Sequence, residues 1–138
     1  MRPQLNHLIV WSRDRHRAAA FLTEVLGFGP PSDWGHFTQV ETGNGVTIDF
    51  ADTNDEPGYM HLAFQVTERQ FDDAFERIVE RGLPYWADPG RSEADTINHH
   101  DGGRGVYFSD PDTSVGWEII TRPYDSGPQE RRPGPGSH

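Results

Sequence analysis

Apolar and polar residues follow strand-like and helix-like spacings along the chain, in an order that the second half repeats. Residues 5–11 (LNHLIVW) form a short apolar run that predicts a buried strand. Residues 14–26 (DRHRAAAFLTEVL) place apolar side chains at helical spacing before Gly27, which predicts a helix ending at that glycine. Residues 36–42 and 45–52 alternate like strands around a GNG turn, which predicts a hairpin.

The second half predicts a strand, a helix and three further strands. These elements are expected at residues 59–66, 68–82, 84–89, 105–110 and 114–121. The chain is therefore predicted to be an α+β protein built from two βαβββ modules, residues 5–52 and 59–122.

Two segments lack the apolar periodicity of the modules. Residues 90–105 are rich in Gly, Asp and Asn, and a connection of this length is typical of a functional lid. Residues 123–138 have almost no apolar content, which predicts a disordered tail. A single domain is therefore expected over residues 1–122.

The repeat pairs two histidines and two carboxylates. His7 and His61 stand at the same point in the first strand of each module, and Asp49 and Glu118 at the same point in the last. A module that cannot bury its face alone must pair with the other, which brings equivalent positions together. Two imidazoles with one or two carboxylates predict a first-row metal site. Two His and one carboxylate with open positions are typical of non-haem Fe(II).

Charge and composition exclude several other classes of function. The net charge of −10 is spread along the chain, so a nucleic-acid partner is not expected. All twelve basic residues are arginine, which indicates a GC-rich coding background. No apolar run reaches the length of a membrane span, and the N-terminus does not resemble a signal peptide. The absence of cysteine rules out thiolate ligands and thiol nucleophiles, and favours a cytoplasmic location.

The doubled module resembles a known superfamily. NHLIV…FLTEVLGF opens the first copy and GRGVYFSDPD…WEIITRP closes the second. Over residues 5–122 this plan is similar to the vicinal oxygen chelate superfamily, which holds glyoxalase I, fosfomycin and bleomycin resistance proteins, and type I extradiol dioxygenases. The resemblance implies a cup-shaped sheet, a homodimer, and metal ligands at the positions of His7, His61 and Glu118, with Asp49 at the fourth-ligand position.

The closing segment NHHDGGRGVYFSDPDTSVGWE also resembles the signature of type I extradiol dioxygenases. The matching residues are His99 or His100, Val106, Tyr107, Asp110, Pro111 and Glu118. The segment departs from the signature at Thr113, where a turn glycine is expected, and by one extra residue before Glu118. The phase of the last strand is therefore left open.

The first functional hypothesis is an Fe(II) oxygenase that uses O₂ to cleave or rearrange a ring of a small aromatic substrate. The residues expected to act on the substrate are His99, His100, Tyr107 and Asp49, and those expected to bind it are Trp86, Arg91 and Arg104. The short, lysine-free chain resembles small members of the superfamily from actinobacterial aromatic polyketide pathways. That resemblance implies a role in antibiotic biosynthesis and a polycyclic substrate.

Two alternatives remain open from the sequence. In a glyoxalase-like isomerase or lyase, Asp49 would be the fourth ligand of Ni(II) or Zn(II), and Mn(II) is a further alternative ion. If Asp49 instead hydrogen-bonds a ligand or the substrate, the oxygenase hypothesis gains. In a metal-free resistance protein, aromatic side chains of the cup would sequester a drug.

Overall fold

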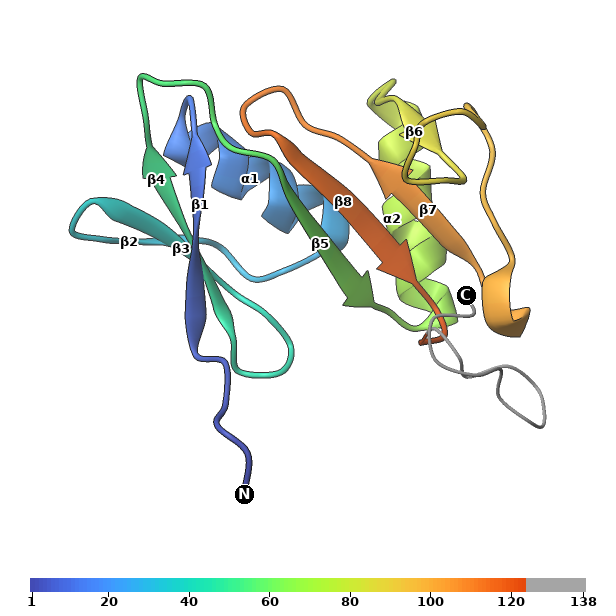
Figure 1. The fold of residues 1–138 in the computed structure, drawn as a ribbon, viewed down its shortest axis with the longest axis horizontal. Coiled ribbons are helices and arrows are strands. Elements are labelled where there is room, and N and C mark those ends of the chain that lie inside the picture. Colours follow the sequence, from blue (N-terminus) through green and yellow to red (C-terminus); the bar gives the residue numbers. More distant parts are fainter. Residues whose placement is uncertain (124–138) are drawn as a thin grey trace. The chain divides into compact units, whose positions relative to one another are not determined.

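The computed structural model describes residues 1–123, and the chain divides into two compact units (Figure 1). The first unit comprises residues 1–60 and 110–115, and the second comprises residues 61–109 and 116–123. Apart from Pro123, the segment predicted as a disordered tail lies outside the described residues. No helix within residues 1–123 is long and apolar enough to cross a membrane.

Both repeats contain one helix and four strands. The first holds β1 (His7–Ser12), α1 (Arg15–Leu26), β2 (Ser32–Trp34), β3 (Phe37–Glu41) and β4 (Thr47–Asp52). The second holds β5 (Met60–Gln65), α2 (Glu68–Glu80), β6 (Tyr85–Trp86), a 3₁₀ turn (His100–Gly102), β7 (Gly105–Phe108) and β8 (Val115–Ile120). The sheets have equivalent strand orders, β1-β4-β3-β2 and β5-β8-β7-β6. The predicted α+β class and the two βαβββ modules are confirmed.

In the first unit, α1 covers one face of its sheet. Asp14 caps the helix by accepting the backbone N–H of Arg17, and Gly27 ends it in the left-handed conformation at φ 79°. The helix buries its apolar side against inward-facing strand residues. The fully or almost fully buried residues of this core include Ala18, Leu22, Val25, Val10, Val40, Ile48 and Phe50. The helix predicted at residues 14–26 agrees with α1 to within one residue.

In the second unit, α2 begins with a capping box formed by Thr67 and Gln70. Its apolar side packs on the inner face of the second sheet, where Phe75 meets the ring of Tyr85 edge-on at 5.2 Å. The buried residues of this core include Phe71, Ala74, Ile78, Val106, Phe108, Trp117 and Ile119. Because alternate residues of a strand point to opposite faces, the neighbours of these strand residues face away from α2.

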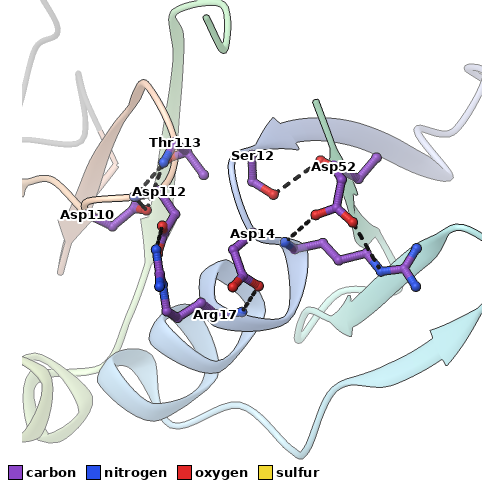
Figure 2. Close-up of polar contacts among 9 residues, drawn as sticks. Ser12, Asp14, Arg17, Asp52, Asp110, Asp112 and Thr113 are labelled. Carbon is purple, nitrogen blue, oxygen red and sulfur yellow. Dashed lines mark hydrogen bonds and ion pairs between the residues drawn. The ribbon is translucent and has the colours of Figure 1, made fainter. Parts of the chain in front are cut away.

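The loop before β8 is anchored within the first unit. The buried Asp112 is paired with the guanidinium of Arg17 (Figure 2). The Asp112 carbonyl also accepts the backbone N–H of Arg13 at 2.8 Å. This pairing raises the pKa of Arg17. Asp110 accepts the backbone N–H groups of Asp112 and Thr113 at 2.9 and 3.0 Å, and also the Thr113 hydroxyl. Thr113, which replaces the expected glycine, thus has a defined partner in the turn.

Candidate functional site

The second sheet brings together two of the three predicted metal ligands. Glu118 of β8 is fully buried, and its Oε1 lies 2.9 Å from Nε2 of His61 on β5. Tyr107 of β7 is directly opposite Glu118 in the sheet, and its ring stacks with the imidazole of His61 at 5.7 Å between centroids. The sheet therefore places an imidazole and a carboxylate next to the ring of Tyr107, on the face opposite α2.

The spacing of His61 and Glu118 fits joint metal ligation. A first-row divalent ion binds histidine nitrogen and carboxylate oxygen at about 2.1 Å, so two ligands at a right angle are about 3.0 Å apart. The observed separation of Nε2 and Oε1 is 2.9 Å, the length of the direct hydrogen bond that the two side chains make, and an ion between them would replace that bond. An imidazole and a carboxylate are also the donor types that non-haem iron takes in oxygenases. The two side chains could therefore hold such an ion at neighbouring positions.

In the first unit, His7 lies on the face opposite α1. Its imidazole is exposed, and Nδ1 lies 2.8 Å from Oδ1 of Asn6. Because a carboxamide oxygen only accepts, Nδ1 donates in this contact, and a neutral imidazole in this tautomer carries its lone pair on Nε2. That tautomer is the one required for ligation through Nε2.

Asp49 is on the same face of the first sheet and is almost completely buried. It lies opposite Ile9 of β1 and Gln39 of β3 in the sheet register. Its Oδ1 accepts hydrogen bonds from Nε2 of Gln39 and from the hydroxyl of Thr47, both at 3.2 Å. The sequence did not identify Gln39 as a partner, because the register between strands has no signal within either strand. Asp49 is thus held in place by two neutral donors.

The two repeats differ at one position that affects their carboxylates. Thr47 in VTIDF corresponds to Gly116 in VGWEI, two residues before Asp49 and Glu118 respectively. The hydroxyl of Thr47 binds Asp49, whereas a glycine at 116 has no side chain to bind Glu118. Glu118 reaches His61 instead. The repeats therefore present one carboxylate held by hydroxyl and amide donors and one paired with a histidine.

Within one unit, the structure brings together two of the four residues predicted to form a metal site. Among residues 1–123, no three or more His, Asp or Glu side chains form a group that could hold a metal ion. His61 and Glu118 form the pair described above, while His7 and Asp49 belong to the first unit. The complete ligand set therefore stays a prediction.

His99 and His100 lie in the connection before β7, and both are exposed. His100 opens the 3₁₀ turn, and its backbone N–H lies 3.3 Å from Oδ1 of Asn98. Neither imidazole has a hydrogen bond or ion pair within residues 1–123. Their predicted role as acid or base stays a prediction.

The predicted substrate-binding arginines have different environments. Arg104 binds the carboxylates of Glu68 and Asp72 on α2, both at 2.8 Å, and covers the ring of Phe71. Its guanidinium therefore stabilises α2, and the substrate-binding role predicted for Arg104 stays a prediction that these contacts do not favour. Arg91, by contrast, lies over the indole of Trp86 at 4.6 Å.

The turn that carries Arg91 is organised by Asp88. Its carboxylate accepts the hydroxyl of Ser92 at 2.7 Å and the backbone N–H of Glu93 at 2.8 Å. The Ser92 hydroxyl is the main cause of a lowered pKa at Asp88, followed by the Glu93 N–H. A lowered pKa means that the carboxylate supports the turn above the ordinary value of 3.8, and that this support is lost as pH falls through the lowered pKa.

Replacement of Ser92 by alanine is expected to move the pKa of Asp88 upward, toward 3.8. NMR titration of the aspartate carboxyl carbons in the wild type and S92A measures the change. Thr96→Ala, an exposed hydroxyl in the same connection, is the control and should leave the titration of Asp88 unchanged. An Asp88 that titrates identically in the wild type and S92A would rule out this account of the turn.

Three comparisons relate the chain to known proteins. A sequence model of the Glyoxalase/Bleomycin resistance protein/Dioxygenase superfamily matches residues 4–119. The solved structure of oxidase ChaP-H2 matches this chain with 48% sequence identity and a TM-score of 0.88. The match covers 92% of this chain and 99% of the ChaP-H2 chain. The structure of oxidase ChaP-H1 matches with 46% sequence identity and a TM-score of 0.85, over 88% of this chain and 98% of the ChaP-H1 chain. Glutathione transferase FosA of Serratia marcescens is 27% identical over 81% of this chain and 77% of its own length.

Proposed function

Because the chain belongs to the glyoxalase/bleomycin resistance protein/dioxygenase superfamily, we propose that it is an Fe(II)-dependent oxygenase that cleaves or oxidatively rearranges a ring of an aromatic substrate. The observation that carries the proposal is the pair of Glu118 and His61 on the face of the second sheet opposite α2. His7 is proposed as the third ligand, supplied by the same chain or by the second copy of a homodimer.

The similarity to two oxidases supports redox chemistry over the other reactions of the superfamily. At 48% and 46% identity, ChaP-H2 and ChaP-H1 are much more similar to this chain than FosA is at 27%. Fold alone does not determine reaction, because one scaffold supports several chemistries. The oxygenase proposal therefore rests on the oxidase relatives together with a two-histidine, one-carboxylate ligand set.

In the proposed reaction, bound Fe(II) supplies the electron transfer between substrate and O₂. The protein contributes orientation and proton handling. The buried Glu118 and the Tyr107 wall limit access of water on one side of the pair. Asp49 accepts its two hydrogen bonds at Oδ1, so Oδ2 is the atom proposed to take a proton from a substrate hydroxyl.

The environment of Asp49 also favours three ligands over four. Two neutral donors already orient its carboxylate from within the first unit, as expected for a residue that binds substrate or positions a ligand. The Ni(II) or Zn(II) isomerase requires Asp49 as a ligand. The alternative is therefore tested by the metal content of an Asp49 variant.

The test is O₂ consumption by protein reconstituted anaerobically with Fe(II) and offered a panel of catechols and polycyclic quinols. We expect uptake only when Fe(II) and substrate are both present, and Ni(II) and Zn(II) protein should be inactive. Asp49→Asn is expected to keep its iron but to lose about 100-fold or more in rate, because the proposed base is neutralised. Iron content and oxygen-electrode traces measure the two effects separately.

Two other results would redirect the assignment. Tight Ni(II) binding that requires Asp49, with no O₂ uptake, would establish the isomerase alternative. If the protein binds no divalent metal, the remaining hypothesis is the metal-free resistance protein that sequesters an aromatic drug.

A further inference from the structure

A row of side chains crosses the face of the second sheet opposite α2, from the buried Glu118 and Tyr107 to the half-buried Trp86. Trp86 of β6 is directly opposite Tyr107 of β7, and Tyr107 is directly opposite Glu118 of β8. Residues directly opposite in antiparallel strands project from the same face. Glu118, Tyr107 and Trp86 therefore form a continuous row, which starts at the pair of Glu118 with His61 and ends at the indole of Trp86.

Arg91 closes the far end of this row. Its guanidinium carbon lies 4.6 Å from the centre of the Trp86 ring, a cation–π arrangement. The side chain is exposed, and its guanidinium has no hydrogen bond or ion pair with any of residues 1–123. Stacking on the indole leaves the N–H groups at the edge of the guanidinium available, and these donors match a carboxylate or phenolate.

The local backbone holds Arg91 in this position. Arg91 has a φ of 60°, a left-handed conformation that is unfavourable for a residue with a side chain. The turn is held by Asp88, and the strand segment at Ala94 bridges back to Trp86. Asn98 donates from Nδ2 to the carbonyl of Ala87 at 2.8 Å. Such over-determined strain is commonly found at ligand sites.

The spacing of the strands sets the length of a molecule that could contact both ends. Neighbouring strands are about 4.8 Å apart, so β6 and β8 are separated by roughly 10 Å. Glu118 is fully buried, so a ligand reaches this end of the row at His61, whose side chain is 39% exposed. A single catechol ring is too short to contact the Glu118–His61 pair at His61 and Arg91 together. A planar molecule of two or three fused rings spans that distance and can lie between His61 and Trp86.

We propose that Trp86 and Arg91 form a binding subsite for the end of the substrate distant from the Glu118–His61 pair. The subsite takes a planar, multi-ring aromatic that carries an anionic oxygen, as a carboxylate or phenolate. This proposal rests on the proposed function. The chain has a net charge of −10, which disfavours the binding of anions over most of its surface. Arg91, which has no ion pair within residues 1–123, therefore favours anion binding at this position.

The test is a calorimetric titration with anthraquinone-2-carboxylate, its uncharged amide and benzoate. Each is added to Fe(II)-loaded protein under nitrogen and to metal-free protein. We expect the three-ring carboxylate to bind at least about 10-fold more tightly than benzoate. Arg91→Gln should weaken the carboxylate about 10-fold or more and leave the amide unchanged, because only the carboxylate forms a charge-assisted hydrogen bond. Trp86→Leu should weaken both three-ring compounds.

Arg69→Gln, an exposed arginine on α2, is the matched control and should bind all three compounds like the wild type. Equal losses in R69Q and R91Q, an unchanged R91Q, or no binding by the wild type would overturn the subsite. Because binding is measured without turnover, these results are independent of O₂ uptake. The subsite proposal can therefore be refuted while the oxygenase proposal is supported, and the oxygenase proposal can be refuted while the subsite proposal is supported.

Discussion

Glu118→Gln is expected to weaken Fe(II) binding at least about 100-fold and to abolish substrate-dependent O₂ uptake. The amide preserves the size of the side chain but removes the charge that a metal-ligating carboxylate provides. The loss of a direct ligand should exceed the roughly 10- to 100-fold effect typical of residues that only position ligands. Iron content after gel filtration and anaerobic titration with Fe(II) measure the affinity.

A matched control separates ligation from general electrostatics. Glu76 is exposed on α2, and Glu76→Gln removes the same charge from the same unit. It should leave iron content and O₂ uptake unchanged. E118Q is expected to fold, because its carboxamide oxygen can still accept a hydrogen bond from His61. Thermal unfolding of the metal-free variant tests this expectation. Full iron content in a folded E118Q would refute the assignment of Glu118 as a ligand.

Asp110→Ala is expected to lower the free energy of unfolding by about 3 kcal/mol. The buried Asp110 is the acceptor for the backbone N–H groups of Asp112 and Thr113 and for the Thr113 hydroxyl. Alanine leaves these buried donors without that acceptor, at about 1–3 kcal/mol for each unsatisfied group. For a chain of this size, the midpoint of thermal unfolding should fall by roughly 10 °C. Differential scanning calorimetry measures both quantities.

Asp110→Asn is the control for this prediction, because its carboxamide oxygen can still accept the two backbone N–H groups. It should destabilise the protein by less than half as much as D110A. If D110N and D110A unfold at the same temperature, the effect arises from the lost charge, and the turn geometry in Figure 2 is not its cause.

The sequence by itself determined the repeated arrangement of the fold. Periodicity located both helices to within two residues at either end, because an amphipathic helix carries its 3.6-residue period in its own residues. It also placed His7 and His61 in the first strands, and Asp49 and Glu118 in the last strands, of the two modules. The three-residue strand β2 (Ser32–Trp34) was not predicted, because all three residues are exposed and so show no alternation of apolar and polar positions.

Only the tertiary structure decided what each side chain contacts. The sequence treated Arg91 and Arg104 alike, yet Arg104 binds two carboxylates of α2 while Arg91 stacks on Trp86. It likewise did not distinguish the partners of Asp49, which include Gln39 and Thr47, from those of Glu118, which include His61. The physical reason is that register and loop closure depend on residues distant in the chain, whereas helical periodicity is local.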